Sequence, residues 1–274
     1  MVRLAWSLLL VAAGCGDPDS ASSESGSESG GDGPAEVMEP AGMPADAALS
    51  DEFDDAATLS QWRIWHEVKG VAATHSLLDI NGENAGQLTL RPNAGGWFDD
   101  FEAPLVYKMV RGDFMVETQV TAAKVGSAAA PPDQPFNSAG LMARDPESGP
   151  GRANWVMFNT GRQRGEQIAS EGKTTVDSAS VLELIDGPHL GLLRMCRVGA
   201  AIVLARQLEG EAAFTVVHRF DRGDLPEDLQ VGLVAGGWNS NAEAPDTSVE
   251  PDIEARFDYI RFSTIDDEAA CTAP

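Results

Sequence analysis

The feature that most constrains the fold is a long succession of short β-prone runs separated by turn residues. The stretch from Asp113 to Val120 is typical, because Phe114, Val116 and Thr118 occupy alternate positions and therefore share one face of a strand. Turn sequences such as Val-Arg-Gly-Asp at 110–113 and Asp-Arg-Gly-Asp at 221–224 separate the runs. The other β-prone runs are 87–91, 104–110, 139–144, 154–159, 192–198, 201–206, 214–220, 229–235 and 256–262.

This pattern predicts one all-β domain over residues 48–265, followed by a C-terminal tail at 266–274. We find no convincing amphipathic helix of about twelve residues and no internal repeat. Short strands at this spacing are typical of a two-sheet antiparallel sandwich, and we expect a jelly roll.

The N-terminus has the pattern of an export signal. Arg3 supplies one positive charge, and residues 4–13 are apolar apart from Ser7. This apolar run is too short to cross about 30 Å of hydrocarbon as a helix, so we predict a signal peptide over 1–14. The junction Ala-Ala-Gly-Cys resembles the lipobox of bacterial lipoproteins, although Ala12 stands where that family prefers Leu. The resemblance implies that Cys15 is lipidated.

Residues 15–47 are expected to form a disordered acidic linker rich in Ser and Gly. The segment 16–47 holds eight acidic residues, no basic residue and no aromatic one, so it has little apolar surface to bury. Such a linker would hold a folded domain away from a membrane. With a lipidated Cys15 it predicts a location in the bacterial cell envelope. Gly16, rather than Asp, follows the cysteine and favours the outer membrane over the inner one.

Charge and cysteine content narrow the partners further. The chain has 43 Asp and Glu against 19 Lys and Arg, a formal net charge of −24, which disfavours nucleic acid and anionic lipid head groups. Membrane contact is therefore expected through the lipid anchor alone. Cys196 and Cys271 remain as a pair that could form a disulfide in an exported protein. The His and Cys residues lack zinc-ligand spacing, and no organic cofactor is expected.

Several motifs resemble concanavalin A-like lectin and glucanase jelly rolls. Asp-Glu-Phe-Asp at 51–54, followed by Leu59 and Trp62, resembles the opening of these domains. The runs 110–117, 138–145, 154–156, 193–199 and 257–262 resemble motifs of the DUF1349 family, which is related to the C-terminal sandwich of some xylosidases. The resemblance covers about residues 48–265. It implies one convex and one concave sheet, and the concave face of such domains often takes carbohydrate.

The same resemblance implies a structural calcium site. A carboxylate near the opening strand and an Asp on the closing strand can hold Ca²⁺ in related jelly rolls, and the matching residues here are Glu52, Asp54 and Asp258. Loop carbonyls would complete the six to eight oxygen ligands that calcium prefers. The alternative is that these are solvated surface carboxylates of a very acidic chain.

A ligand surface is the second candidate site. Aromatic rings pack on the C–H faces of sugars, and planar polar groups bind their hydroxyls. Gly-Gly-Trp occurs at 95–97 and again at 236–238, in sequences typical of loops. We expect Trp238 to be exposed in a long polar loop, whereas core packing is the better interpretation of Trp155. The full candidate set is Trp97, Asp99, Asp100, Arg144, Asn154, Trp155, Trp238, Asn239 and Asn241.

The run Glu-Pro-Asp-Ile-Glu at 250–254 resembles the catalytic E-x-D-x-E run of family 16 glucanases. Pro251 is poorly placed for a central strand, and the run lies just before the closing strand, so we predict that it is not catalytic. The favoured function at this point is a membrane-tethered, non-catalytic module that binds glycan or another surface polymer. The alternatives are a glycoside-active enzyme of the same fold and a structural envelope protein.

Overall fold

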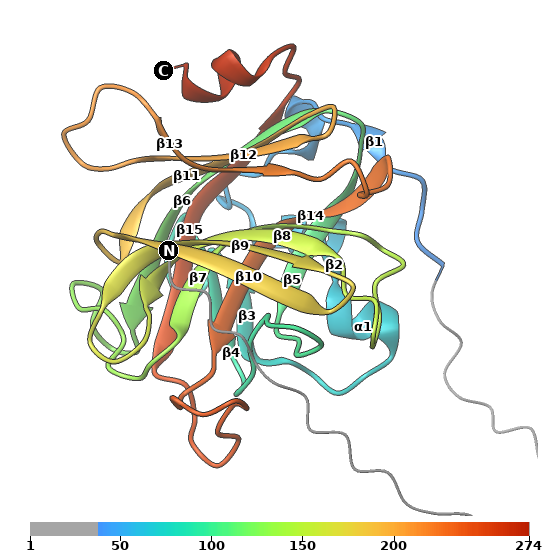
Figure 1. The fold of residues 1–274 in the computed structure, drawn as a ribbon. Helices are drawn as coiled ribbons and strands as arrows, with labels where there is room; N and C mark the ends of the chain where they lie inside the picture. Colours follow the sequence, from blue (N-terminus) through green and yellow to red (C-terminus); the bar gives the residue numbers. More distant parts are fainter. Residues whose placement is uncertain (1–37, 274) are drawn as a thin grey trace, which may run out of the picture. The chain divides into compact units, whose positions relative to one another are not determined.

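Two antiparallel sheets form the domain in the computed structural model, which describes residues 38–273. Sheet A has the strand order β1-β5-β14-β7-β8-β9-β10, with β2 also paired to β5, and sheet B has the order β13-β12-β11-β6-β15-β4-β3 (Figure 1). Every pairing is antiparallel except the two-residue contact between β1 and β5. This arrangement confirms the predicted all-β sandwich.

The strands of sheet A are β1 (Met43–Pro44), β2 (Arg63–Ile64), β5 (Leu105–Arg111), β7 (Asn137–Arg144), β8 (Trp155–Arg162), β9 (Ile168–Val176), β10 (Ala179–Asp186) and β14 (Asp228–Gly237). Those of sheet B are β3 (His75–Ile80), β4 (Leu88–Pro92), β6 (Phe114–Lys124), β11 (Leu190–Val198), β12 (Ala201–Gln207), β13 (Thr215–Asp221) and β15 (Ile253–Ser263). Short helices are η1 (Ala47–Leu49), η2 (Ala56–Gln61), α1 (Trp65–Lys69) and η3 (Glu268–Thr272).

The main core lies between the two sheets and follows the predicted alternation. In β6, Phe114, Val116, Thr118 and Val120 are fully buried, while Met115, Glu117 and Gln119 between them are more exposed. Leu141 and Phe158 from sheet A belong to the same cluster. Side chains of a strand point alternately to its two faces, so an apolar residue at every second position gives each strand one face that packs in the core.

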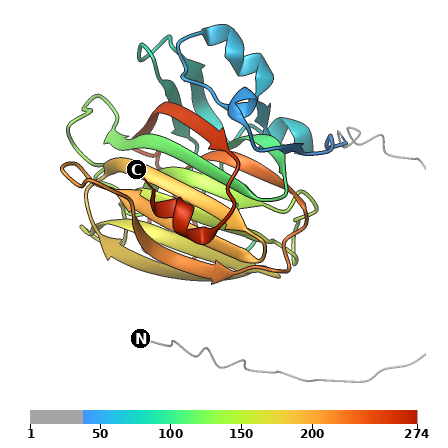
Figure 2. The same ribbon diagram turned by 90° about the horizontal axis from the view of Figure 1, so that it is seen from above.

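A second apolar cluster covers part of the outer face of sheet A. Trp65 from α1 and Trp97 from the loop 93–104 pack there against Trp155 of β8. Helix α1 ends at Gly70, whose φ of 65° places it in the left-handed region that favours glycine. Figure 2 shows α1 and its neighbouring N-terminal segments (blue to cyan) gathered on one side of the sandwich.

The N-terminal boundary of the domain differs from the prediction. Residues 38–47 were expected to be linker, but Met43 and Pro44 pair with β5, and Ala45 is buried in the main core. The predicted signal peptide, Cys15 and the rest of the predicted linker lie outside the described residues. Among the described residues, no helix is long and apolar enough to cross a membrane.

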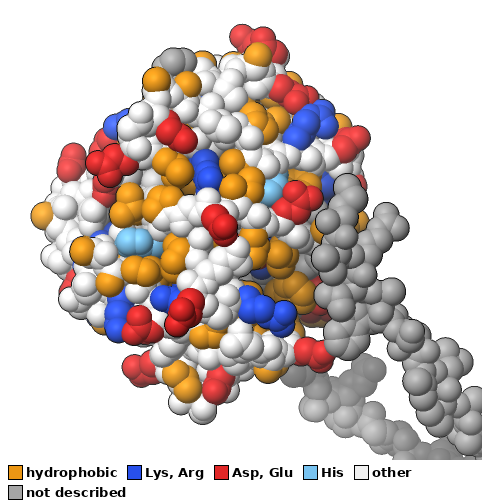
Figure 3. Space-filling model, turned by 60° about the vertical axis from the view of Figure 1, so that its left-hand side comes forward, with side chains coloured by type: hydrophobic (Ala, Val, Ile, Leu, Met, Phe, Trp, Pro, Cys, Tyr) orange, Lys and Arg blue, Asp and Glu red, His pale blue; other side chains and the backbone are white. Residues whose placement is uncertain are grey.

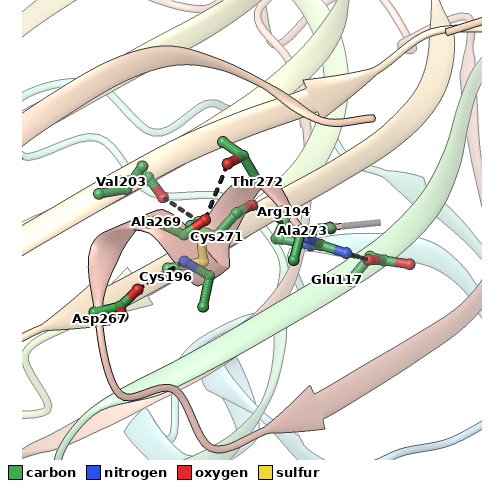
Figure 4. The surroundings of a disulfide bond; sticks show 10 residues. Glu117, Arg194, Cys196, Val203, Asp267, Ala269, Cys271, Thr272 and Ala273 are labelled. Carbon is green, nitrogen blue, oxygen red and sulfur yellow. Dashed lines mark hydrogen bonds and ion pairs between the residues drawn. A yellow bond between two sulfur atoms is a disulfide. The ribbon is translucent and has the colours of Figure 1, made fainter. Parts of the chain in front are cut away.

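The predicted C-terminal tail is fastened to the outer face of sheet B. Cys271 in η3 forms a disulfide with Cys196 of β11, with their Cα atoms 6.1 Å apart (Figure 4). Arg194 donates hydrogen bonds to the carbonyl oxygens of Cys271 (3.1 Å) and Ala273 (2.6 Å). Helix η3 therefore covers a small apolar cluster that includes Phe214.

Removal of the disulfide should lower the free energy of unfolding. The bridge joins residues 75 positions apart, so it restricts the unfolded chain strongly. We expect Cys271→Ser to cost about 2–5 kcal/mol, measured by urea unfolding. Reductant should destabilise the wild type by a similar amount and leave the variant unchanged. Equal stability of wild type and variant without reductant would contradict a structural role for the bridge.

Candidate functional site

The candidate site lies where the loop 93–104 crosses the outer face of sheet A. Gly95 and Gly237 exchange two backbone hydrogen bonds, at 3.0 and 2.8 Å, which fix the start of the loop to the end of β14. Lys173 of β9 donates a hydrogen bond to the carbonyl oxygen of Trp97 (3.0 Å) and forms an ion pair with Glu171 (3.0 Å). The loop is thus held at two points on a rigid sheet, which is a common way to position functional groups.

Two of the predicted ligand-binding tryptophans are packing residues. The Trp97 ring meets Trp65 and Trp155 edge to face, with centroids 5.8 and 6.2 Å away, and its Nε1 donates to the carbonyl oxygen of Pro104. Trp97 and Trp155 are both almost completely buried. Neither ring is available to stack on a sugar. Core packing, which the sequence favoured for Trp155, is therefore the role of Trp97 as well.

Arg144 lies beneath these rings at the centre of the site. Its side chain is only 1% exposed, and burial lowers the pKa of its guanidinium. It donates hydrogen bonds to Gln230 Oε1 (2.7 Å) and to the carbonyl oxygen of Ser148 (2.9 Å), while its Nη2 lies 3.7 Å from Glu102 Oε1. Arg144 therefore does not contact a ligand directly but orients the groups around it.

Glu102 and Asp100 are two carboxyl groups in different surroundings. Burial raises the pKa of Glu102, and the charge of Asp100 raises it further, against the opposing effect of Arg144 and Lys69. Asp100 accepts hydrogen bonds from Ser178 Oγ and from the Gly151 N–H (3.0 Å). Glu102 is thus suited to hold a proton, which is the role of the acid in an acid–base site, and Asp100 is a second carboxyl group held in place by two hydrogen-bond donors.

The neighbouring Asp99 has a structural task. With a φ of 49°, it stands in the left-handed region, at the tip of the turn between Phe98 and Phe101. Its carboxylate accepts from the Ser180 N–H (2.9 Å), and its own N–H donates to Ser180 Oγ (2.7 Å). Asp99 therefore attaches the loop to β10 through its backbone N–H and one carboxylate oxygen.

Trp238 is a packing residue, and the expectation that it is exposed is wrong. Its side chain is 7% exposed and meets Phe98 and Phe101 edge to face at 6.1 and 5.0 Å. It lies flat against Gly96, where an added Cβ would come 2.9 Å from the indole. The exposed aromatic ring of this cluster is Phe101, at 40%. A phenyl ring supported from behind by an indole is a suitable surface for a sugar ring.

The three predicted asparagines do not converge on one ligand. Asn154 accepts a hydrogen bond from Arg222, and Asn239 is bonded to Asn137 and to the carbonyl oxygen of Val249, both at 3.0 Å. Asn241 is exposed in the loop after β14. The sequence predicts a polar loop over 236–253, and the structure has one between β14 and β15, where Asn239 fixes the loop to Asn137 and to its own residue Val249.

The three predicted calcium ligands have other partners. Glu52 forms a two-point ion pair with Arg261 at 2.7 Å, and Asp258 accepts a hydrogen bond from Gln87. Asp54 contributes its backbone carbonyl to Asn81. Within residues 38–273, no group of three or more acidic, His or Cys side chains is placed to hold a metal ion. Calcium binding stays a prediction, and the three residues predicted as ligands do not form a cluster in the described part of the chain.

The E-x-D-x-E run does not form a carboxylate pair. Asp252 accepts backbone N–H groups of Asp133 and Gln134, whereas Glu254 is buried between Arg91 and Arg256. Glu250 is exposed before the strand begins. Asp252 and Glu254 therefore have separate structural partners, and Glu250 stands apart from both.

Sequence reasoning missed the most informative groups of the site. Glu102 is two residues after the predicted Asp100, yet nothing in the sequence shows that it faces a buried arginine. Glu39, Arg63, Tyr107 and Gln230 meet beside Arg144, although they come from distant segments. A signal existed only for the loop itself, through its Gly-Gly-Trp motif.

Comparison with known proteins supports the concanavalin A-like fold. No protein-family model matches the sequence, and no curated protein is similar to it in sequence. The GH43 protein BlXynB from Bacillus licheniformis is similar in structure, with a TM-score of 0.59 and 13% identity over 80% of this chain. A xylan β-1,4-xylosidase from Bacillus halodurans C-125 gives 0.57 and 18% over 78%. An endo-β-1,3-glucanase from Pyrococcus furiosus gives 0.52 and 13% over 85%.

The extent of these matches differs. This chain covers 40% of BlXynB and 39% of the xylosidase, but 99% of the glucanase. The class defined by the fold is therefore a concanavalin A-like jelly-roll sandwich. At these identities the likeness establishes the fold and leaves the activity to be tested.

The comparisons contradict the predicted non-catalytic binding module. The similar structures named above include a xylosidase and a glucanase, so they favour the alternative of a glycoside-active enzyme. The burial of Trp97 and Trp238 agrees with this correction. The binding prediction depended on these two rings being exposed to stack on a sugar, and both are buried.

Trp238 and Phe101 should differ in their effect on stability. Trp238→Ala removes a buried ring from Gly96 and both phenylalanines, so we expect a loss of about 3–5 kcal/mol. Phe101→Ala removes a more exposed ring and should cost about 1 kcal/mol or less. Urea unfolding of both variants measures the difference. Similar stability of the Trp238 variant and the wild type would show that the indole is not a packing residue.

Proposed function

We propose that this chain acts on glycosides, with Glu102 as the proton donor to the leaving oxygen. The observation that carries the proposal is the placement of Glu102, a carboxyl group whose pKa is raised, in one loop with Asp100 and the exposed ring of Phe101. Glycoside hydrolysis requires two carboxyl groups, one of which donates a proton to the leaving oxygen. The likeness to a xylosidase and a glucanase supports this choice of reaction.

Each group has a distinct role in this proposal. Phe101 would stack on a sugar ring, and Glu102 would donate its proton to the glycosidic oxygen as the bond breaks. Asp100, positioned by hydrogen bonds from Ser178 and Gly151, would act as the second carboxylate, on the water or on the anomeric carbon. Arg144 at 3.7 Å from Glu102 would stabilise the carboxylate that remains after proton transfer.

Substitution of Glu102 tests the proposal directly. Glu102→Gln keeps the shape of the side chain but has no acidic proton, so kcat on β-1,3-glucan or β-1,4-xylan oligosaccharides should fall by about 10²–10⁴. Glu166→Gln is a matched control, because Glu166 is exposed in the turn before β9. Thermal melts of both variants should resemble that of the wild type. An inactive wild type on both substrates, or full activity of Glu102→Gln, would overturn the proposal.

The pH profile provides an independent check of the same residue. Glu102 must be protonated to act as the acid, and its pKa is raised above the ordinary value. The rate constant kcat/KM should therefore fall as the pH increases through the pKa of Glu102, giving an alkaline limb that begins above the ordinary range of a glutamate. Glu102→Gln should abolish this limb.

The location of the protein is a further proposal. The lipobox-like junction supports lipidation of Cys15 and attachment to the outer membrane, and the motifs quoted above support a relationship to the DUF1349 family. Cys15→Ser should release the protein from the membrane fraction into the soluble one, as judged by immunoblot. If the variant still sediments with membranes, the anchor is elsewhere.

A further inference from the structure

A second polar cluster lies beside Arg144 on the outer face of sheet A. The carboxylate of Glu39 accepts hydrogen bonds from the Tyr107 hydroxyl and from Gln230 Nε2 (2.7 Å), and its other oxygen lies 2.8 Å from Arg63 Nε. These three groups come from β5, β14 and β2. Glu39 itself comes from the segment that precedes β1, so the sandwich binds a carboxylate from outside its sheets.

We propose that Arg63, Tyr107 and Gln230 form a subsite for the carboxylate of a uronic acid residue in a polysaccharide, which Glu39 occupies as an internal substitute. This inference rests on the proposed function and specifies its substrate class. It differs from the proton-donor role of Glu102, because it concerns recognition of a charged sugar.

The subsite is preorganised without help from Glu39. Arg144 donates to Gln230 Oε1 at 2.7 Å, which turns the amide so that its Nε2 is the group facing Glu39. Gln230 and Tyr107 are completely buried. Burial raises the pKa of Tyr107, so its hydroxyl stays protonated and able to donate. Fixed donors of this kind favour a planar anion with two acceptor oxygens.

Four buried polar atoms of the cluster have no hydrogen-bond partner among the described residues. Three are donors, Arg63 Nε, Arg63 Nη2 and Arg144 Nε, and one is an acceptor, Glu39 Oε2, which lies 2.8 Å from Arg63 Nε as an ion pair. The unpartnered donors therefore outnumber the acceptor. Without Glu39, the Tyr107 hydroxyl and the Gln230 amide would also lack an acceptor, which is costly for buried polar groups. An anionic ligand would satisfy them, whereas a neutral sugar at this position would leave the guanidinium charge of Arg63 uncompensated.

Glu39 is attached to the domain in a way that permits exchange. Met38 is 90% exposed, and the strand pairing of this segment begins only at Met43. Gly42 already lies against Val110 and Arg111 of β5 and hydrogen-bonds Asp228, so it is the carboxylate of Glu39, within residues 38–41, that enters the cluster. An external carboxylate could replace it while β1 stays in place.

The position of the subsite connects it with the proposed catalytic group. Arg144 contacts Gln230 through Nη1 and faces Glu102 through Nη2, so one guanidinium lies between the two sites. A uronic acid residue and a neighbouring glycosidic bond could then be recognised together. The net charge of −24 opposes a polyanion at long range, but at physiological salt this repulsion is screened beyond about 8 Å.

Titration with D-glucuronate tests the subsite without any glycosidic bond to cleave. We expect Glu39→Ala to bind glucuronate at least tenfold more tightly than the wild type in calorimetric titrations, because the internal competitor is gone. Glu52→Ala is the matched control, because it also removes a glutamate that pairs with an arginine, in this case Arg261 of β15 in sheet B. Glucose should bind neither variant measurably, and Arg63→Ala in the Glu39→Ala background should abolish the gain.

Three results would overturn the inference. The first is an affinity of Glu39→Ala no higher than those of the wild type and Glu52→Ala. The second is equal binding of propionate and glucuronate, which would mean that the sugar contributes nothing. Glu39→Gln keeps the side-chain shape without the charge, and it replaces Glu39→Ala if that variant unfolds at a lower temperature. The third contradicting result is then a glucuronate affinity of Glu39→Gln equal to that of the wild type. The variant Glu102→Gln distinguishes the two proposals. If it binds glucuronate as the wild type does while hydrolysis is not observed in either protein, the proposed hydrolysis fails and the subsite stands.

Discussion

The buried guanidinium of Arg144 is the constraint around which the candidate site is organised. Taking a charge out of water is expensive unless hydrogen bonds and a counter-charge surround it. The protein meets this requirement with Gln230, the Ser148 carbonyl and Glu102, and it places the rings of Trp65 and Trp97 at 5.7 and 5.9 Å from the guanidinium carbon. Helix α1 and the loop 93–104 are both needed to provide these partners, so their positions follow from the same charge.

The rest of the sandwich provides a rigid support for this arrangement. Sheet A is backed by the main core and sheet B, and sheet B is fastened at its outer face by the disulfide and by Arg194. On the face drawn in Figure 3, basic side chains stand among acidic and apolar ones. Several basic side chains are paired locally, as in the Glu52–Arg261 and Arg111–Asp228 pairs, while acidic side chains remain in excess over the chain as a whole.

Most of the strands could be predicted from the sequence, and five could not. The alternation in β6 and the turn before it identified that strand from its start to Val120, four residues short of its end at Lys124. The two-residue strands β1 and β2 were missed, and so were β3, β9 and β10. In β9, Glu171, Gly172 and Lys173 interrupt the apolar pattern, because the outward positions carry a buried ion pair where apolar residues would be expected. Only the neighbouring loop, which supplies the carbonyl of Trp97 to Lys173, explains that choice.

The sequence by itself determined the all-β fold, the approximate strand order along the chain and the importance of the loop after Gly95 and Gly96. These properties depend on periodicity and on turn residues, which are local. Only the tertiary structure decided that Trp97 and Trp238 are buried, that Glu102 faces Arg144, and that Glu39 reaches Tyr107 across 68 positions of sequence. Sheet pairing and packing bring such groups together, and no local pattern encodes the distance between residues that meet only after the sheets have formed.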